Sequence, residues 1–435
     1  MAQKLRKTVM APIARFVKIE SLSGLLLFLA TITALIWANS PYAASYHRIW
    51  THDVGFEFGN FELTKPLLLW VNDGLMAIFF FLIGLEIKRE ILLGELNGFK
   101  KASLPIFAAL GGVFIPISLF FFLNNDPSTI DGWGIPMATD IAFSLAILQL
   151  LGDRVPLSLK IFLTAFAIVD DLVAVLAIAI FYSSHIDWGL IGYALVILLF
   201  LVVLSYRRYY NKYIYFSLGT IVWFLFLKSG IHPTIAGVLV ALIIPIRKAT
   251  PLMDSLEGLD DITNKLHRVT IKEKPMLSKR QIYLIDGMQD WIANVQSPLQ
   301  HLEHHFHGWV AYFIIPIFAF ANSGISLDIG SEGDMSLPIN LAIALVVGKS
   351  IGVILFSYLG VKLGIAALPK GLKFKHIIGV SFLAGVGFTM AIFIANLAFE
   401  ENESFIELSK LGILSGSVIA GLLGYLFLRF ATRKN

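Results

Sequence analysis

Residues 190–204 read LIGYALVILLFLVVL and contain no charged side chain. Wound into a helix, this stretch is apolar on every side, whereas a membrane-spanning β-strand alternates apolar and polar residues over about 10 positions. A helix that crosses a bilayer needs about 20 largely apolar residues. The stretch and its flanks therefore predict a transmembrane helix rather than a strand of a barrel.

The rest of the chain repeats this pattern. Of its 435 residues, 57% are hydrophobic and 15% are charged, whereas soluble domains carry about 25% charged residues. Lipid must therefore be the solvent for most of the surface. We predict an all-α membrane protein in which residues 1–435 form one transmembrane domain of about twelve helices. The predicted spans are 21–38, 66–86, 103–122, 129–150, 157–181, 189–206, 212–229, 231–246, 308–322, 338–358, 376–398 and 406–430.

Basic residues predict which loops are cytoplasmic. With the N-terminus inside, most of the 34 lysine and arginine residues lie in segments assigned to the cytoplasm, as the positive-inside rule requires. The inside group includes Lys4, Arg6, Lys7, Lys88, Arg89, Lys100, Lys101, Arg207, Arg208, Lys373 and Lys375. The outside exceptions are Arg48, Lys65, Lys228 and Lys410. We expect both termini in the cytoplasm, and the net charge of +4 gives no reason to expect a nucleic-acid partner.

The first outside loop, residues 47–65, predicts a β-hairpin. Apolar and polar side chains alternate there on both sides of a Gly59-Asn60 turn. The free edge of such a hairpin can pair with the same edge of a second protomer, or the hairpin can pack on its own protomer. We expect the first arrangement, and hence a homodimer.

The longest polar segment, residues 247–303, is predicted to be a cytoplasmic loop between spans 8 and 9. Leu256, Leu259, Ile262 and Leu266 recur in it at helical spacing. This spacing is compatible with a short amphipathic helix on the membrane surface, or with a solvated connector.

Two predicted spans contain residues that interrupt helices. The fourth contains GWGIPMATD over residues 132–140, and the eleventh contains GVSFLAGVGFT over residues 379–389. Each is the middle helix of a triplet, spans 3–5 and spans 10–12, and the loop charges give the two triplets opposite topology. Interrupted helices at matching positions of inverted repeats mark the binding site of many secondary transporters. We therefore predict two discontinuous helices at the centre of an inverted repeat.

Charged side chains inside the predicted spans are the most informative residues of the chain. Each costs roughly 2.5–3.5 kcal/mol at the centre of a membrane helix, so each needs a partner or a function. They are Asp73, Glu86, Asp140, Asp170, Asp171 and Lys349.

Several of these charges have an alternative, purely structural explanation. Asp73 could cap or pair at the outer end of its helix, and Glu86 could belong to a charge cluster at the membrane edge. Lys349 could neutralise one aspartate as a buried ion pair. These alternatives remain open at the level of sequence.

The adjacent aspartates Asp170 and Asp171 are harder to explain structurally. Two carboxylates in an apolar helix repel each other, and burial disfavours their charged forms, so we expect the pair to bind protons. Sodium is a hard cation and prefers oxygen ligands. Carboxylates of Asp171 and Asp140, with Thr139, could supply them, while Asp170 faces Lys349. Cations and protons would then compete for the same oxygens, which is the chemistry of an antiporter.

The chain also resembles a known family in a set of short motifs. Besides the Asp170-Asp171 pair they are VNDGLMA (71–77), GLEIKRE (84–90), ATDIAF (138–143), KIFL (160–163), FAFANSG (318–324), GK (348–349) and GFTM (387–390). Their order and spread along nearly the whole chain resemble the NhaA family of bacterial sodium/proton antiporters, one of the families from which the rule on interrupted helices was drawn.

The resemblance implies an electrogenic exchanger of the bacterial inner membrane, which moves two protons inward for each Na⁺ or Li⁺ moved outward. It implies an ion and proton site at Asp140, Asp170, Asp171, Thr139 and Lys349, with Na⁺ held by Asp171, Asp140 and Thr139. It implies a role in sodium and pH homeostasis and no cofactor. It leaves open whether Lys349 carries a transported proton.

The resemblance further implies activation at alkaline pH through charges near the cytoplasmic mouth. The matching positions are Glu86, Glu90, Glu303, His304 and His307, with His232 near an outer helix end. Histidine titrates near neutrality, which suits a pH sensor, but the histidines at 301–307 could equally form a solvated cluster. This chain departs from better-known members by a long insert before Glu303.

Two other functions are weaker fits. A sodium-coupled symporter of an organic solute would need polar or aromatic anchors in a roomy cavity, whereas a cation site accounts for nearly all the intramembrane polar groups. An intramembrane aspartyl protease would need aspartates on two facing helices sharing one proton, which neither adjacent aspartates nor a buried lysine suits. We therefore expect a transporter and not an enzyme.

Overall fold

The computed structural model describes residues 22–58, 61–183, 186–246, 278–295, 297–326, 334–369 and 371–432. Within these residues helices predominate, and the strands belong to one hairpin formed by β1 (Asp53–Phe58) and β2 (Phe61–Pro66). The described residues are therefore mainly helical, as the apolar composition of the chain predicts.

The helices follow one another with short connections. The first ones are the helix over Leu22–Ala38, α2 (Ala43–Thr51), α3 (Leu67–Leu69), η1 (Trp70–Leu75), α4 (Met76–Leu93), α5 (Phe99–Leu123), η2 (Pro127–Met137), α6 (Ile141–Leu150), η3 (Gly152–Arg154), α7 (Leu157–Phe181), α8 (Trp188–Tyr206) and α9 (Lys212–Ser229). The later ones are α10 (Thr234–Ile243), α12 (Lys279–Val295), α13 (Pro298–Trp309), η4 (Val310–Ile314), α14 (Ile315–Asn322), α15 (Ser336–Ile343), η5 (Ala344–Gly348), α16 (Lys349–Lys362), α17 (Phe374–Ala384), α18 (Phe388–Ala398) and α19 (Glu403–Ala431).

Six helical runs in the described part of the chain are long and apolar enough to cross a bilayer. They are Leu67–Leu93, Phe99–Leu123, Leu157–Phe181, Trp188–Tyr206, Ser336–Lys362 and Glu403–Ala431. Three pairs of helices joined at a sharp bend raise the number to nine if each pair counts as one span. The chain is thus a multi-pass all-α membrane protein, while the count of twelve spans and the inverted repeat stay predictions.

The local sequence explains where a helix such as α8 begins and what it faces. The side chain of Asp187 accepts hydrogen bonds from the backbone N–H groups of Gly189 and Leu190, which satisfies donors that the first turn leaves free. Further along, Leu195 and Leu199 are more than half exposed. Large apolar side chains on the surface of a long helix are expected where lipid replaces water.

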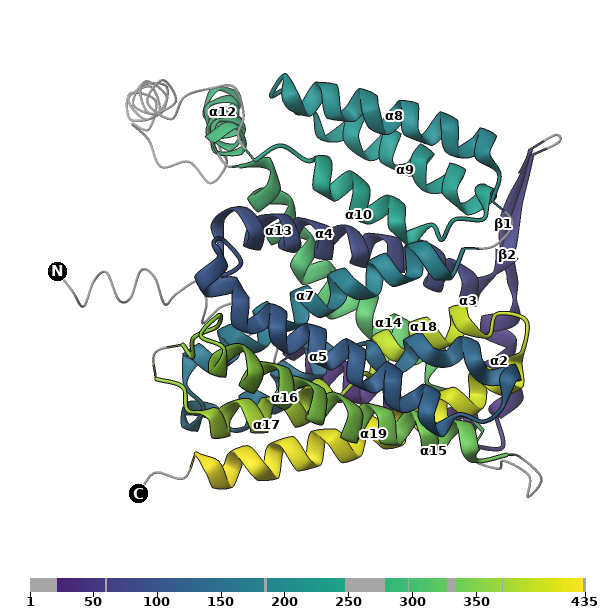
Figure 1. The fold of residues 1–435 in the computed structure, drawn as a ribbon. Helices are drawn as coiled ribbons and strands as arrows, with labels where there is room; N and C mark the ends of the chain where they lie inside the picture. Colours follow the sequence, from purple (N-terminus) through teal and green to yellow (C-terminus); the bar gives the residue numbers. More distant parts are fainter. Residues whose placement is uncertain are drawn as a thin grey trace.

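The long helices lie side by side with their axes roughly aligned (Figure 1). The strands β1 and β2 lie at one end of this bundle, which we call the hairpin end. Helix α19 ends at Ala431 at the other end, which we call the tail end.

The hairpin is antiparallel, with Asp53 opposite Pro66 and Phe58 opposite Phe61. The residues of the predicted Gly59-Asn60 turn lie outside the described part of the chain. An ion pair of 3.0 Å between Lys65 of β2 and Asp73 of η1 ties the hairpin to the helices.

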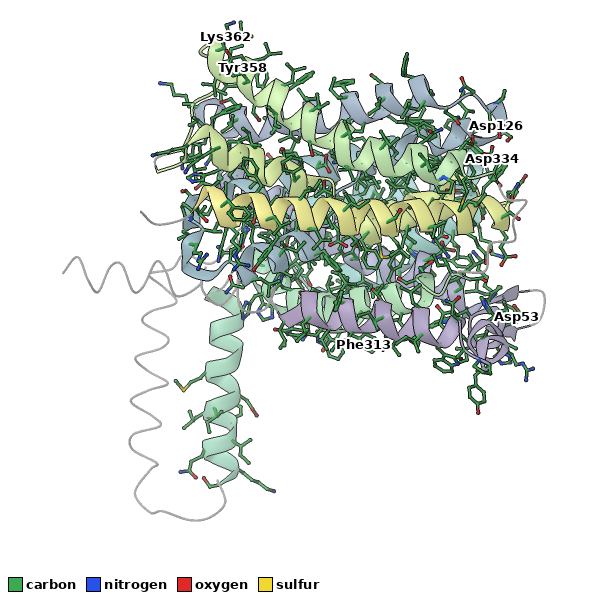
Figure 2. All side chains as sticks on the ribbon, turned by 90° about the horizontal axis from the view of Figure 1, so that it is seen from below. Asp53, Asp126, Phe313, Asp334, Tyr358 and Lys362 are labelled. Atoms are coloured by element: carbon green, nitrogen blue, oxygen red, sulfur yellow. The ribbon has the colours of Figure 1, made fainter. Side chains whose placement is uncertain are left out.

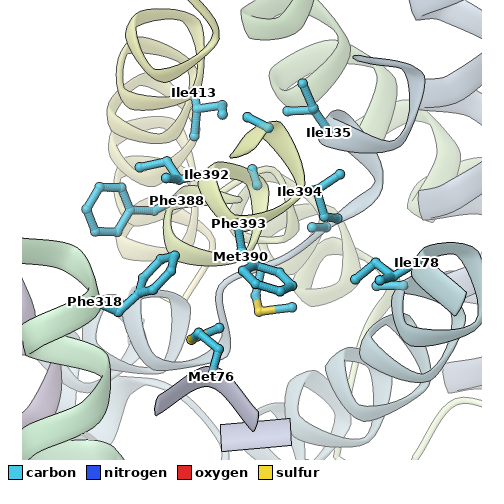
Figure 3. Close-up of a cluster of buried hydrophobic side chains, with 14 of the residues drawn as sticks. Met76, Ile135, Ile178, Phe318, Phe388, Met390, Ile392, Phe393, Ile394 and Ile413 are labelled. Atoms are coloured by element: carbon cyan, nitrogen blue, oxygen red, sulfur yellow. The ribbon is translucent and has the colours of Figure 1, made fainter. Parts of the chain in front are cut away.

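The helices pack as two layers. The first layer contains η1 with α4, then α8, α9, α10, and α13 with its continuation α14; the second contains α5, α6, α7, α16, α17, α18 and α19. Buried side chains from both layers meet between them, among them Met76 and Phe318 from the first and Met390 and Phe393 from the second (Figure 3). This shared core is where the two layers are in contact.

Within the second layer, α5 and α16 approach each other very closely. A Cβ atom on Gly111 would collide with the carbonyl oxygen of Gly352, and one on Gly352 would collide with the carbonyl oxygen of Gly111. Small residues at such crossings let membrane helices pack backbone to backbone. This contact fixes the start of α16, and therefore the position of Lys349.

The segment 247–303, predicted as a loop, contains helical structure in its described part. Helix α12 occupies Lys279–Val295, and Figure 2 shows it projecting sideways from the bundle at the tail end. Leu284, Ile285 and Met288 recur in it at helical spacing, and α13 begins before the predicted loop ends. The amphipathic helix suggested by Leu256–Leu266 lies outside the described residues.

Candidate cation and proton site

Two interrupted helical runs cross at the centre of the bundle. The run from η2 to α6 bends by 49° around residues 138–140, and the run from α17 to α18 bends by 43° around residues 385–387. Interruption leaves backbone groups without helical partners, and in lipid these must be satisfied inside the protein. The two breaks satisfy each other: the N–H of Asp140 donates to the carbonyl of Val386 at 2.7 Å, and the hydroxyl of Thr139 donates to the carbonyl of Ala384 at 2.9 Å.

Asp140 stands at the start of α6 and is held by donors from both broken runs. Its Oδ1 accepts a hydrogen bond from the N–H of Phe143 at 2.9 Å, as an N-cap does. Its Oδ2 accepts from the N–H of Thr389 at 3.1 Å and from the hydroxyl of Thr389 at 2.6 Å. The positive ends of α6 and α18 therefore both point at this one carboxylate.

Lys349 and Asp170 form the buried ion pair of the site. The Nζ atom of Lys349 lies 2.7 Å from Oδ2 of Asp170 and donates a second hydrogen bond of 2.8 Å to the hydroxyl of Thr139. Both charged side chains have no exposed surface. Lys349 also lies over the ring of Phe166, 5.8 Å from its centroid. The pair therefore couples α7 and α16 to the break in the fourth predicted span.

Asp171 lies next along α7 and faces a different environment. It is 2% exposed and lines a cavity of about 60 Å³ together with Asp140, Thr139 and Thr389. A water molecule needs about 10–15 Å³ on this measure, so the cavity has room for a small ion and a few waters. Glu86 and His307 line the same cavity on the side of the tail end.

Two carboxylate oxygens of the site make no hydrogen bond to the described residues. They are Oδ1 of Asp170 and Oδ1 of Asp171, and both are buried. A buried polar atom without a partner is costly, so the one on Asp171, which lines the cavity, indicates a ligand, a proton or ordered water.

The residues present fit a small hard cation. Asp171 and Asp140 both line the cavity and can offer carboxylate oxygens, which such cations prefer. The hydroxyl of Thr139 is already engaged, since it accepts from Lys349 and donates to Ala384. In this arrangement Thr139 therefore positions Lys349, and one lone pair of its hydroxyl oxygen is left for an ion.

The chain as a whole matches one family of transporters. Residues 14–428 match the family described as Na+/H+ antiporter 1. This chain belongs to that family. The Na(+)/H(+) antiporter NhaA of Oleidesulfovibrio alaskensis is 48% identical over 435 residues, which cover 98% of this chain and 95% of the relative. Proteins of the same name from Sulfurimonas denitrificans and Parabacteroides distasonis are 43% and 41% identical and are covered over 98% and 97% of their length.

Membership confirms the resemblance found in the sequence and makes this chain a transporter, not an enzyme. The relatives are matched over nearly their full length.

A cluster of charges lines the tail end of the antiporter. Arg89 forms ion pairs of 2.6 Å with Glu90 and 2.7 Å with Glu303, and His307 lies 3.7 Å from Glu86. Burial raises the pKa of Glu303 to about 7, although the charge of Arg89 opposes this shift. Glu303 therefore changes charge near neutral pH.

The structure separates the remaining predicted residues from this cluster. His304 is exposed and is not among the residues that line the cavity. His232 is buried near the hairpin end, where its Nε2 lies 3.8 Å from Asp73. Asp73 also pairs with Lys65, so it takes part in a structural contact as the alternative explanation proposed.

Several residues of the site were not singled out from the sequence. Thr389 supplies two hydrogen bonds to Asp140, and the hydroxyl of Ser144 donates to the carbonyl of Leu383 at 2.8 Å across the crossing. Thr389 follows directly on the glycine-rich break, and this position was a usable signal for a functional role. Ser144 carries no such signal, because serine is common in membrane helices.

Proposed function

We propose that this chain exchanges Na⁺ or Li⁺ for protons across a membrane at the site formed by Asp140, Asp170, Asp171, Thr139 and Lys349. The observation that carries the proposal is the meeting of Asp171 and Asp140 at the cavity, with Oδ1 of Asp171 buried and without a hydrogen-bond partner in the described residues. The names of the relatives, Na(+)/H(+) antiporter NhaA, support the same exchange.

Competition for one set of oxygens explains how the site would couple the two ions. A cation bound between Asp171 and Asp140 requires both carboxylates to be ionised, and a proton on Asp171 removes a ligand and a charge. The same position then holds either the cation or the proton. Exchange follows when the site opens alternately to the two sides of the membrane, and no cofactor is needed.

Transport of two protons per cation needs a second group that binds a proton. The Lys349–Asp170 pair is the candidate, because Lys349 reaches the crossing through its hydrogen bond to Thr139. Loss of one proton from this pair, together with one from Asp171, would make the exchange electrogenic. Protonation states of such coupled groups belong to the set rather than to one residue.

We further propose that the protein lies in a bacterial inner membrane with the tail end of the bundle in the cytoplasm, and that both termini of the chain are cytoplasmic. The excess of lysine and arginine in the loops at that end supports this orientation. Outward movement of Na⁺ and inward movement of protons would then serve sodium and pH homeostasis.

Activation at alkaline pH would act through the cluster at the tail end. Glu303, with a pKa of about 7, loses its proton as the pH rises and then carries the charge that pairs with Arg89. Glu86, Glu90 and His307 lie around this ion pair or line the adjoining cavity. A change in the charge of Glu303 therefore changes the electrostatic potential at the entrance to the site. His304 is exposed and His232 lies beside Asp73 near the hairpin end, and a part for them in pH sensing stays a prediction.

A homodimer formed through the hairpin is the proposed assembly. Strands β1 and β2 pair with each other, which leaves the outer edge of each strand able to pair with a second copy in the bilayer. Crosslinking in lipid tests this: dimers are expected for the native chain and monomers after deletion of the hairpin. Monomers for the native chain would refute it.

The exchange itself is tested in everted membrane vesicles from cells that lack their own sodium/proton antiporters. The vesicles are acidified by respiration, NaCl, LiCl or KCl is added, and a dye reports the pH gradient at neutral and alkaline pH. We expect Na⁺ and Li⁺ to collapse the gradient with the native protein and not with Asp171→Asn. Asp126→Asn, at a half-buried aspartate that precedes η2 and does not line the cavity, is the matched control and should behave as native. If no cation collapses the pH gradient although the native protein is correctly inserted, the proposal is overturned.

A further inference from the structure

Three asparagines from three helical elements meet near the hairpin end. The side-chain N–H of Asn322 donates to Oδ1 of Asn72 at 2.9 Å, and the side-chain N–H of Asn396 donates to Oδ1 of Asn322 at 2.7 Å. Asn322 also donates to the carbonyl of Phe318 at 3.0 Å. We call these three residues the asparagine cluster. None of them lines the cation cavity or contacts the aspartates.

The cluster bridges the two layers of the fold. Asn72 on η1 and Asn322 at the end of α14 belong to the first layer, whereas Asn396 on α18 belongs to the second. Amide groups buried in a membrane protein are costly unless they are hydrogen-bonded, and Asn322 is fully buried. Together these bonds therefore tie the layers at this position.

Aromatic rings lie next along the chain from the cluster, on α18, on α14 and on α4, which continues η1. The ring of Phe393, one turn before Asn396, lies 5.4 Å from the ring of Phe80 on α4 and 6.2 Å from that of Phe318 on α14. Figure 3 shows Phe318 and Phe393 in the buried core with Met76 and Met390. The contact between the layers is thus closed by apolar rings and amides at the hairpin end.

Toward the tail end, the contact between the same two layers contains the cation cavity. The cation cavity is lined by Phe79, Leu82 and Glu86 of the first layer and by Asp171 and Thr389 of the second, among others. Its charged lining, Glu86 and His307, lies on the side of the tail end. One interface is therefore hollow on one side of the aspartates and hydrogen-bonded on the other.

We propose that Asn72, Asn322 and Asn396 are positioning residues that hold the hairpin end of the cation pathway closed while the tail end is open. This inference rests on the proposed function, because alternating access requires that one end be closed when the other is open. Opening at the hairpin end would separate α18 from α14 and break the bond between Asn396 and Asn322. The amides would then exchange their partners for water entering the pathway.

The expected effect is a shift in the population of the two states. Hydrogen bonds between membrane helices are individually weak, and loss of an average one shifts an equilibrium by about threefold. Asn396→Leu removes the bond while keeping the size of the side chain, and Asn396 is only partly buried, so the variant should fold. Asn396→Ala serves as a second variant if leucine does not fit.

The test uses a single reporter cysteine, since the chain contains no cysteine of its own. Met76→Cys places it one turn below Asn72, where the native side chain is 2% exposed. A membrane-impermeant maleimide is applied to the hairpin side, and its rate of reaction is measured with and without Asn396→Leu. We expect the rate to rise about threefold or more. Asn340→Leu is the control, because Asn340 on α15 is another buried amide that bonds outside the cluster, to the carbonyl of Leu123.

The outcomes separate this inference from the proposed function. An unchanged rate in both folded Asn396 variants would overturn the inference, as would an equal rise with Asn340→Leu, and the vesicle assay decides independently whether exchange occurs. If exchange is absent from the native protein while the labelling still rises, the closure at the hairpin end is supported and the antiport proposal fails. If exchange is intact and the labelling does not rise, the closure at the hairpin end is refuted and the antiport proposal stands.

Discussion

Nζ of Lys349 lies 2.7 Å from Oδ2 of Asp170, and neither side chain has any exposed surface. The two residues are 179 positions apart and come from α16 and α7. Thr139 completes the group by accepting a hydrogen bond from the same Nζ atom. One lysine therefore fixes the relative position of two helices and of the break between η2 and α6.

Removing one member of this pair should destabilise the protein strongly. Lys349→Met leaves the Asp170 carboxylate buried without its partner, and loss of one member of a buried pair costs about 3–5 kcal/mol. The double variant Lys349→Met/Asp170→Asn removes both charges and should recover much of this loss. Thermal unfolding of the purified variants measures both effects. A double variant no more stable than Lys349→Met would mean that the pair is not the source of the stability.

Thr389 should set the affinity for the cation. Thr389→Val keeps the shape of the side chain and removes the hydroxyl that donates to Asp140 at 2.6 Å. A hydrogen bond to a charged group is worth about 1.5–3 kcal/mol, so the apparent KM for Na⁺ should rise roughly tenfold or more while the protein still folds. The vesicle assay with varied NaCl gives this value. Thr220→Val, an exposed threonine on α9, is the control and should leave the KM unchanged.

The pH profile should depend on Glu303. Burial raises the pKa of this carboxyl to about 7, so it is largely protonated below that pH and ionised above it. Glutamine resembles the protonated form at every pH, and Glu303→Gln should therefore move the midpoint of activation toward alkaline pH by about one unit. Glu400→Gln, an exposed acid near the hairpin end, serves as the control. A midpoint that does not move, or that moves toward acidic pH, would exclude Glu303 from the activation step.

The close contact of α5 with α16 should not tolerate a methyl group. A Cβ atom on Gly352 collides with the backbone carbonyl of Gly111, which cannot rotate away. Overpacking of this kind costs about 1–3 kcal/mol or more, so Gly352→Ala should lower the unfolding temperature and the yield of folded protein. Gly192→Ala is the matched control, because no atom lies within 4 Å of the position its Cβ would take. Equal stability of the two variants would show that the helices can separate without cost.

Residues that stand out in a membrane were recognisable from the sequence alone. The stretch 190–204 predicts a spanning helix, and Asp170, Asp171 and Lys349 are conspicuous because lipid makes every buried charge costly. The breaks near Asp140 and at residues 385–387 were also predicted, since glycine and proline act on the local backbone. These features depend on a residue, its neighbours and the solvent, and for that reason they need no knowledge of the fold.

What only the tertiary structure decided is which distant groups meet. Thr389 contacts Asp140 across 249 positions, and the asparagine cluster joins residues 250 and 74 positions apart. Neutral hydroxyl and amide side chains are common in membrane helices, so residue type alone does not distinguish these from others of their kind. Their importance comes from the partners that packing of the two layers provides. The same reason explains why His307 lines the cavity whereas His232 and His304, although they are also histidines, are not among its lining residues.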